Sequence, residues 1–261
     1  MNKMANRLTK KQLASLIRAT AATTITPQPQ PGRRRNRRRR RRNRSNATVM
    51  TSVPAAMSVA QGYRGPTMSG GVGEITISHS EIVTTSSVSS TVNVQTYRII
   101  PSFPPWLSGL AGNFSKYRWI NFRAVWIPSC PSSTSGSIHM ALRYDESDTN
   151  PTTTAQISTM QSYSTGAIWS GAQGASLLHR SSGPCPPGSI CTNLDTSRLE
   201  KPWYVYRVAA NVSTTSDVAN IVVPATLVVA TEGGTGTATT AGHIHWVYTV
   251  RCIEPIPTAL N

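Results

Sequence analysis

The strongest constraint on this chain is the separation of its charge between two segments. Residues 1–44 carry fifteen lysine and arginine side chains and no aspartate or glutamate. The whole chain has 26 basic and 10 acidic residues, so eleven basic and ten acidic side chains remain for residues 45–261. A run of like charges repels itself and cannot bury an apolar core. The chain therefore divides into a polycationic arm that does not fold alone and a nearly neutral body that can.

The arm is most highly charged at residues 33–44, where ten of the twelve residues are arginine. Each guanidinium can form two parallel hydrogen bonds with phosphate oxygens, and each neutralised phosphate releases counterions. We therefore predict a disordered arm over residues 1–44 that binds RNA with little dependence on base sequence. A nuclear-localisation signal, which can coexist with RNA binding, and a membrane-active peptide are the alternatives. The predicted RNA-binding residues are Lys3, Arg7, Lys10, Lys11, Arg18, Arg33, Arg34, Arg35, Arg37, Arg38, Arg39, Arg40, Arg41, Arg42 and Arg44.

The body has the pattern of an all-β domain. Charged residues make up only 14% of the chain, and apolar and polar residues alternate in several short segments, which is typical of half-buried strands. Short helices are expected only over residues 105–112 and 152–160. This pattern favours a jelly-roll or another β-sandwich over residues 71–261, preceded by a connecting arm over residues 45–70. The eight predicted strands are Glu74–His79, Thr91–Tyr97, Trp119–Pro128, Ser137–Tyr144, Ala167–Ser170, Trp203–Val208, Ala225–Ala230 and His243–Val250.

The four cysteines, Cys130, Cys185, Cys191 and Cys252, form no C-x-x-C pair, and the chain starts without the apolar stretch of a signal peptide. Both observations favour an intracellular protein with free thiols. Cys185 and Cys191 are close enough in sequence to close a small loop, but a reducing compartment favours two thiols. No apolar window approaches the 18 residues that a membrane span requires, so no membrane partner is expected.

One cluster of side chains could hold a metal ion, and it lies just after a predicted strand. Residues 144–150 contain Asp145, Glu146 and Asp148. Carboxylate oxygens suit Ca²⁺, although the spacing differs from that of an EF-hand and an acidic solvent-exposed loop is the alternative. His243 and His245 share a strand face but have no visible third ligand, so we interpret them as half-buried strand residues. No catalytic motif is present, and we do not expect an enzyme.

The sequence resembles the coat proteins of sobemoviruses, which are plant viruses with a T=3 icosahedral shell. The similarity runs through most of the chain and includes the arginine run. The other matching segments are Arg7-Leu-Thr-Lys-Lys-Gln-Leu-Ala, Asn113-Phe-Ser-Lys-Tyr-Arg-Trp, Ile127-Pro-Ser-Cys-Pro-Ser-Ser-Thr-Ser-Gly-Ser-Ile-His-Met, Tyr144-Asp145-x-x-Asp148-Thr149, Trp169-Ser-Gly, Lys201-x-Trp203-Tyr204, Val223-Pro-Ala and Ile253-Glu-Pro…Ala259-Leu-Asn261.

This resemblance implies a structural capsid protein with an eight-stranded jelly-roll shell domain. It implies 180 self-assembled copies around single-stranded viral RNA, and an arm segment near Pro54 that can form a β-annulus. The protein is then expected in the virion, in the host cytoplasm during assembly, and in the nucleus if the arginine run directs entry. A cellular coating protein of ribosomal or chromatin type is the rival, but such proteins usually spread basic groups over the fold.

The resemblance also implies Ca²⁺ between neighbouring subunits. Its ligands would be Asp145 and Asp148 of one copy, with the Tyr204 carbonyl and the Asn261 region of the next. Either the amide or the terminal carboxylate of Asn261 could coordinate, and Glu146 could strengthen or crowd the site. Ca²⁺ or protons would remove the repulsion between the two aspartates, so the shell is expected to loosen when Ca²⁺ is removed at neutral pH.

Overall fold

The computed structural model describes residues 65–180, 182–212 and 219–256. Ten strands lie within these residues, and short helices occupy the connections between them. The strands are β1 (Thr67–Gly71), β2 (Glu74–Val88), β3 (Asn93–Arg98), β4 (Phe114–Pro128), β5 (Ser137–Arg143), β6 (Gln161–Ala167), β7 (Cys191–Asn193), β8 (Tyr204–Val205), β9 (Thr226–Glu232) and β10 (Thr239–Pro255). The helices are α3 (Pro105–Ala111), α4 (Thr154–Ser158) and α5 (Ala219–Val222), with 3-10 turns η1 (Ala172–Leu177), η2 (Thr196–Arg198) and η3 (Ala209–Asn211).

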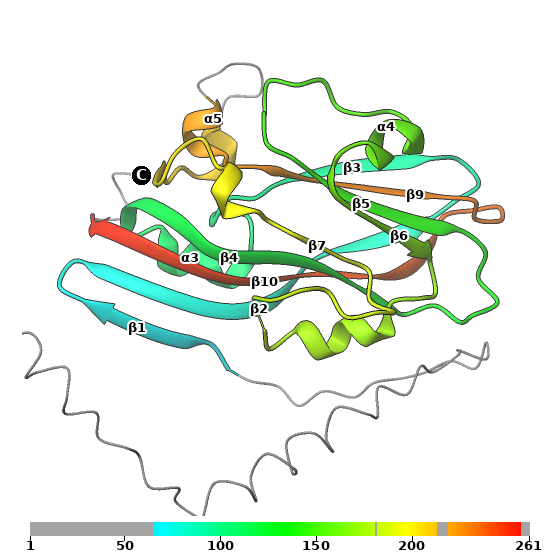
Figure 1. Cartoon of the computed structure of the whole chain (residues 1–261), viewed down its shortest axis with the longest axis horizontal. Helices are drawn as coiled ribbons and strands as arrows, with labels where there is room; N and C mark the ends of the chain where they lie inside the picture. The colour runs from blue at the N-terminus through cyan, green and yellow to red at the C-terminus, as the bar shows by residue number, and fades with distance from the viewer. Residues whose placement is uncertain (1–64, 181, 213–218, 257–261) are drawn as a thin grey trace, which may run out of the picture. The chain divides into compact units, whose positions relative to one another are not determined.

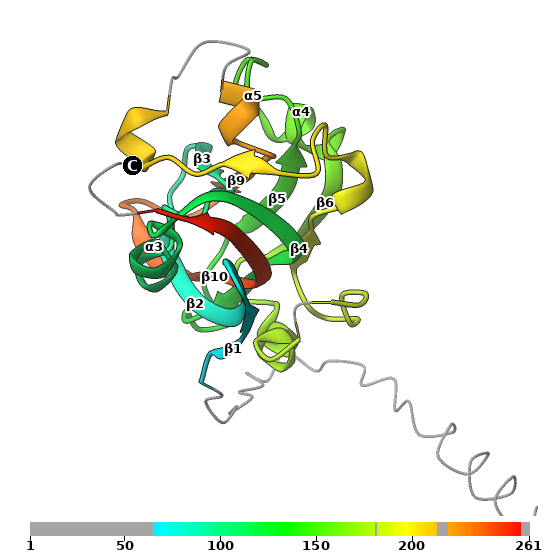
Figure 2. The same cartoon turned by 90° about the vertical axis from the view of Figure 1, so that its left-hand side faces the viewer.

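The strands form two antiparallel sheets that face each other. The first sheet has the order β1-β2-β10-β4-β7, with β8 also paired to β4, and the second has the order β3-β9-β5-β6. Figure 1 shows β10 between β2 and β4, and Figure 2 shows the two sheets on opposite sides of the interior. Strands from the beginning and the end of the body are therefore neighbours in both sheets. The predicted all-β jelly-roll sandwich is confirmed.

The alternation of side chains along the strands places the core between the sheets. On β10, Ile244, Trp246, Tyr248 and Val250 are buried, while the intervening His245 and Thr249 are only partly so. The strands β5 and β9 are buried on both faces: one face joins the large apolar cluster of β10, and the other packs with Ile157 of α4 in a smaller cluster. Two indoles of this cluster also satisfy main-chain carbonyls: Trp119 Nε1 donates to Ile99 O at 3.0 Å, and Trp126 Nε1 donates to Ile168 O at 3.1 Å.

The strand predictions differ from the structure at several places, and β2 and β10 are also longer than predicted. The predicted strand Ala167–Ser170 is wrong, because β6 ends at Ala167. The polar sequence of β6, Gln-Ser-Tyr-Ser-Thr-Gly-Ala, lacks the alternation of apolar and polar residues by which strands were predicted. The strands β1 and β7 were not predicted, since all five residues of β1 are exposed and β7 has three residues. Only Tyr204–Val205 of the predicted strand Trp203–Val208 pairs with β4.

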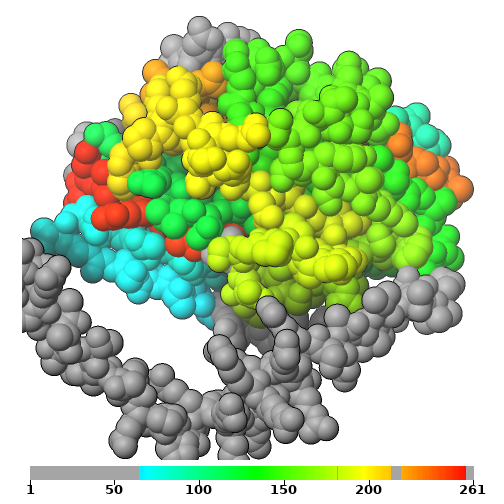
Figure 3. All heavy atoms as spheres, viewed as in Figure 1, coloured from blue at the N-terminus to red at the C-terminus, as the bar shows by residue number. Residues whose placement is uncertain are grey.

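The strand β1 lies across the predicted boundary at residue 71. It pairs with β2 through a hairpin in which Gly71 faces Glu74, so the last residues of the predicted connecting arm belong to the first sheet. Gly73, in the turn, has a φ of 75°, a conformation that glycine adopts without a steric penalty. Figure 3 shows this hairpin, in cyan, at the surface.

The two helices expected from the sequence are present and short. The helix α3 matches residues 105–112, and α4 lies within residues 152–160. A capping box begins α4: the Thr153 side chain accepts from Gln156 N at 3.3 Å, and Thr153 N donates to Gln156 Oε1 at 3.3 Å. None of the helices in the described ranges is long and apolar enough to cross a membrane.

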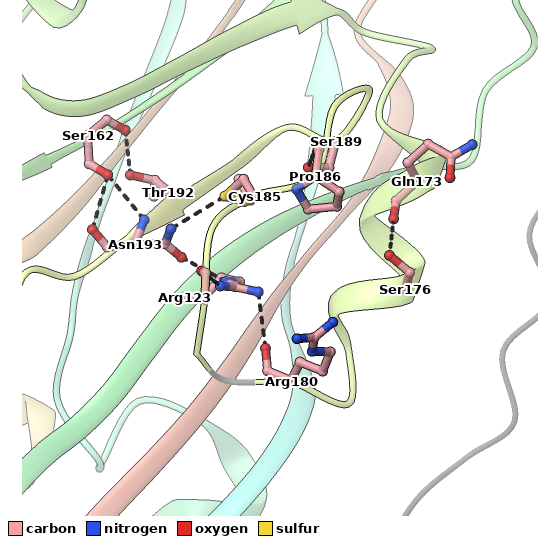
Figure 4. The surroundings of a disulfide bond; sticks show 12 residues. Arg123, Ser162, Gln173, Ser176, Arg180, Cys185, Pro186, Ser189, Thr192 and Asn193 are labelled. Carbon is pink, nitrogen blue, oxygen red and sulfur yellow. Dashed lines mark hydrogen bonds between the residues drawn. A yellow bond between two sulfur atoms is a disulfide. The ribbon is translucent and has the colours of Figure 1, made fainter. Parts of the chain in front are cut away.

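A disulfide joins Cys185 and Cys191, so the preference for two thiols is wrong in this structure. Cys130 and Cys252 are free. The preference rested on the cellular compartment, whereas the fold decides which sulfur atoms meet, and here the two Cα atoms are 6.2 Å apart. Asn193 Nδ2 contacts Cys185 Sγ at 3.5 Å and so connects the bridge to the end of β7 (Figure 4).

The loop that carries the disulfide is also held by Arg123 of β4, which is 0% exposed. Its Nε donates to Asn193 Oδ1 at 2.7 Å, its Nη1 donates to Arg180 O at 3.1 Å, and its Nη2 donates to Gly183 O. Figure 4 shows the guanidinium between Asn193 and Arg180. All three of these acceptors are neutral, so Arg123 joins carbonyls of the loop to the first sheet without a carboxylate among these bonds. The loop therefore has one covalent and one hydrogen-bonded attachment.

Reducing the Cys185–Cys191 bridge should destabilise the body moderately. A loop of this size restrains the unfolded chain by about 2 kcal/mol, while Arg123 continues to hold the folded loop. The free energy of unfolding, measured by urea denaturation with and without dithiothreitol, should fall by about that amount. The variant Cys185→Ser with Cys191→Ser should not respond to the reductant, and Cys130→Ser should respond as the parent does. Equal stability of the parent with and without reductant would contradict the role of the bridge.

Candidate metal centre

The acidic loop, residues 144–150, leaves the second sheet at a charged end. It follows β5, whose last residue Arg143 faces Thr226 of β9, and Thr226 in turn faces Arg98 of β3. Two arginines, on the strands at either side of β9, thus flank one threonine where the loop begins. In Figure 1 the loop runs from the end of β5 near α5 towards α4. Side chains from three strands can therefore contact the loop.

Glu146 of the acidic loop points into this charged end. Its side chain is 7% exposed, and its Oε1 lies 2.6 Å from Arg98 Nε while its Oε2 lies 3.3 Å from Arg143 Nη2. The Thr226 hydroxyl also donates to Oε2. One buried carboxylate is therefore shared by two guanidinium groups, an arrangement in which the opposite charges and hydrogen bonds offset the cost of burial. Both carboxylate oxygens of Glu146 are thus occupied by these partners. Glu146 therefore neither strengthens nor crowds a metal site at the loop.

Arg143 holds the remainder of the acidic loop. Its Nη1 donates to Asp148 O at 2.7 Å and to Asn150 Oδ1 at 2.8 Å. Its side chain is as buried as that of Glu146. The loop is thus folded over its own arginine, with Glu146 turned inward and the two aspartates on the exposed side. Burial separates the three acids of the cluster into one structural carboxylate and two accessible ones.

Asp145 carries a carboxylate with one occupied oxygen. Its Oδ1 accepts from Ser147 Oγ at 2.7 Å, from Ser147 N at 2.9 Å and from Asn220 Nδ2 at 2.8 Å. These bonds, those from the Ser147 and Asn220 side chains first, lower the pKa of Asp145 to about 2. The group therefore stays ionised in mild acid, and its protonation would not relieve repulsion until about pH 2. Its Oδ2 accepts no hydrogen bond from the residues that the structure describes.

Asp148 supplies a second exposed carboxylate three residues later. Its side chain forms no hydrogen bond or ion pair with any residue in the described ranges, although its carbonyl is held by Arg143. Two accessible carboxylates on a fixed loop are hard oxygen donors of the kind that Ca²⁺ binds. Within the described part of the chain, no three histidine, cysteine, aspartate or glutamate side chains lie close enough to hold a metal ion. The donors fit Ca²⁺ as part of a site that needs further oxygen ligands.

The other predicted ligands are separate from this loop or outside the described residues. Tyr204 belongs to β8 of the first sheet, where it pairs with Tyr117, and it is buried with its hydroxyl accepting from Lys201 N at 3.3 Å. Asn261 lies outside the described residues, as do Pro54 and all fifteen predicted RNA-binding residues. The structure therefore brings Asp145 and Asp148 together on one loop and places Tyr204 in the other sheet.

Sequence reasoning missed Asn220, which contacts the acidic loop from α5. Its Nδ2 donates to Asp145, and its Oδ1 accepts from Glu146 N at 2.8 Å. Asn220 is 75 positions from Asp145 in a short apolar stretch, Ala219-Asn-Ile-Val, and no local pattern connects the two. The role of Arg98, which is 48 positions from Glu146, was missed for the same reason. Arg143 is only three positions from Glu146, and its role was also missed.

His243 and His245 are partly buried on β10, as interpreted from the sequence. His243 Nδ1 lies 3.2 Å from Thr85 Oγ1. Burial and the neighbouring His243 lower the pKa of His245 to about 4. A bulge in the pairing with β2 separates the two histidines, since the register shifts between Ile244 and His245. No third ligand side chain accompanies them in the part of the chain that the structure describes.

Replacing Glu146 with glutamine should destabilise the body strongly. The substitution keeps the shape of the side chain but leaves Arg98 and Arg143 without their shared counter-charge, which costs about 3 kcal/mol of unfolding free energy when an ion pair is buried. Urea denaturation of the variant and the parent measures this difference. The control is Glu254→Gln, whose pair with Lys116 is about half exposed and should contribute much less. Similar losses for both variants would contradict the structural role of Glu146.

Comparison with known proteins identifies the family of this fold. Residues 47–258 match the family model described as viral coat protein (S domain). The chain is 42% identical over 168 residues to the capsid protein of Tobacco necrosis virus (strain D), covering 64% of this chain and 62% of that protein. It is 30% identical over 222 residues to the capsid protein of Poinsettia latent virus, covering 81% of this chain and 72% of that protein. The matched region thus spans less than two thirds of the first relative's length.

Solved structures show the same architecture. The structure of Tobacco necrosis virus superposes with a TM-score of 0.72 at 28% identity, covering 78% of this chain and 93% of that chain. Cocksfoot mottle virus shares the fold, with a TM-score of 0.64 at 21% identity over 70% of this chain and 96% of that chain. The sobemovirus assignment stays a prediction, since relatives with higher identity come from other plant viruses. The broader prediction of a viral coat protein is confirmed: the chain belongs to the viral coat protein (S domain) family.

Proposed function

We propose that this protein is a structural capsid protein that assembles into an icosahedral shell around single-stranded RNA. The match of residues 47–258 to the viral coat protein S domain carries this proposal. The body supports it, because its two antiparallel sheets form a double-sheet jelly roll, an architecture that viral capsid domains commonly use. The protein acts as a building block of the virion.

The basic arm supplies the attraction for RNA. Its fifteen positive charges have no acidic residue to balance them, whereas the body is nearly neutral. In a shell of 180 copies, the number that the sobemovirus resemblance implies, the arms would contribute roughly 2,700 positive charges, enough to neutralise much of a genome of a few thousand phosphates. Binding of this kind depends on phosphates rather than bases, so the arm condenses the RNA without reading its sequence. The shell domain, in contrast, has to contact other copies of itself.

The acidic loop supplies half of a Ca²⁺ site between subunits. Asp145 Oδ2 and the Asp148 carboxylate are the donors available from one copy, and a neighbouring copy would complete the site with the Tyr204 carbonyl and the Asn261 region. Without a cation, two carboxylates held three residues apart repel each other and any acidic group of the neighbour. A bound divalent cation replaces this repulsion with attraction across the interface. Removal of Ca²⁺ at neutral pH therefore loosens the shell.

Deleting residues 1–44 should abolish RNA packaging. The truncated protein keeps all the described strands but loses all fifteen arm charges, so it should form empty or smaller particles. Absorbance ratios and extraction of RNA from purified particles measure the packaged amount. A matched control reverses the order of residues 1–32 and leaves the arginine run intact, and it should package RNA. Unchanged RNA content in the truncated particles would contradict the packaging role.

The variant Asp145→Asn with Asp148→Asn should give particles that no longer respond to a calcium chelator. The parent particles should swell and lose heat stability when chelator is added at pH 7.5, because the two charges are then uncompensated. Sedimentation and thermal melting of assembled particles measure both effects. Glu254→Gln, which removes an exposed acid elsewhere, should swell as the parent does. Equal chelator responses in the parent and the double variant would contradict the Ca²⁺ function.

A further inference from the structure

Asn220 forms hydrogen bonds with two neighbouring acidic residues of the loop, Glu146, which points inward, and Asp145, which points outward. Its Oδ1 accepts from Glu146 N at 2.8 Å, and its Nδ2 donates to Asp145 Oδ1 at 2.8 Å. Glu146 is the buried member of the loop and Asp145 is an exposed one. The side-chain amide of Asn220 thus bonds both to the main chain of the buried Glu146 and to the exposed carboxylate of Asp145.

Only one orientation of this amide satisfies both bonds. A main-chain N–H can only donate, so it requires the amide oxygen, and the ionised carboxylate can only accept, so it requires the amide nitrogen. A rotation of the side-chain amide by 180° would break both interactions. The geometry of Asn220 is therefore determined by its two partners, and it in turn restrains the direction of the Asp145 side chain relative to Glu146.

The consequence for Asp145 is that its two oxygens become unequal. Ser147 donates to Oδ1 from one side through its main-chain N and its hydroxyl, and Asn220 donates to the same oxygen. With three donors on Oδ1, the oxygen left for a cation is Oδ2. Ser147 belongs to the loop itself, whereas Asn220 comes from α5. The hydrogen bond from Asn220 therefore fixes Asp145 relative to another element of the fold.

The loop is anchored on its other side by the buried ion cluster. Arg98 reaches Glu146 from β3 and also donates to Val212 O at 3.3 Å, at the end of η3. Tyr117 of β4 donates to Val222 O at the end of α5. The helix α5 is thus tied to β4, so Asn220 extends from an anchored helix.

We propose that Asn220 is a positioning residue of the Ca²⁺ half-site, one that orients the Asp145 carboxylate and leaves Oδ2 for the cation. The inference rests on the proposed Ca²⁺ function and adds a residue that does not itself contact the metal. Partners that hydrogen-bond a metal ligand fix its orientation, and losing one typically lowers metal affinity by about 10-fold to 100-fold.

The test compares Asn220→Ala with the parent as assembled particles of the full chain. Free Ca²⁺ is titrated into chelator-swollen particles, and the concentration that half-restores the compact form is measured by sedimentation. We expect this midpoint to rise by about 10-fold in Asn220→Ala. Thermal melting of the dissociated subunits in chelator is measured in parallel. A merely structural role would lower the melting temperature and leave the Ca²⁺ midpoint unchanged.

The matched control is Asn93→Ala, at the opposite end of β3 from Arg98. Asn93 forms no side-chain hydrogen bond with a residue in the described ranges, so its Ca²⁺ midpoint should equal that of the parent. If Asn220→Ala does not assemble, Asn220→Gln replaces it, because the longer side chain keeps the amide but cannot place it between the same two partners. The expected result is again a higher midpoint.

The outcomes separate the positioning role from the Ca²⁺ function. An unchanged midpoint in the Asn220 variants, together with a lost response in Asp145→Asn with Asp148→Asn, would overturn the role of Asn220 and leave the Ca²⁺ site standing. A response of that double variant equal to the parent's would overturn both. A raised midpoint in the Asn220 variants and an unchanged one in Asn93→Ala would support the proposal.

Discussion

One buried carboxylate shared by two guanidinium groups determines the shape of the end of the second sheet that carries the acidic loop. Glu146 neutralises Arg98 and Arg143 from the strands on either side of β9, and each arginine also donates to a main-chain carbonyl. The acidic loop follows this arrangement, since turning Glu146 inward leaves Asp145 and Asp148 on the exposed side. Burying such a cluster is tolerable only when every member is paired, so the loop has little freedom to adopt another conformation.

A second buried arginine, Arg123, holds a different loop against the body. Arg123 is fully buried in the first sheet, and its acceptors among the described residues are a side-chain amide and two main-chain carbonyls rather than a carboxylate. It organises the loop closed by Cys185 and Cys191, where a short irregular segment needs donors for its carbonyls. The body thus uses long cationic side chains to hold irregular segments against its sheets. These residues account for part of its small basic content, whereas fifteen of the 26 basic residues of the chain lie in the arm.

Strands in which apolar and polar residues alternate could be predicted from the sequence. Strands without this alternation could not. The helix expected over residues 152–160 contains α4, and alternation located β2, β3 and β10. It failed for β6, whose polar residues give no periodic signal, and for the three-residue β7. The acidic loop was found because its carboxylates are adjacent in sequence, but its composition did not show which acid turns inward. That choice depends on Arg98, which is 48 positions away.

The amino-acid sequence by itself determined the division into a polycationic arm and a neutral β-rich body, because charge and alternation are properties of neighbouring residues. It also identified Asp145 and Asp148 as the acids to consider. Only the tertiary structure decided that Glu146 is a structural ion, that Asn220 contacts Asp145, and that Cys185 meets Cys191. The physical reason is that hydrogen bonds and ion pairs depend on atoms within a few ångströms, and the sheets bring together residues that the chain keeps far apart.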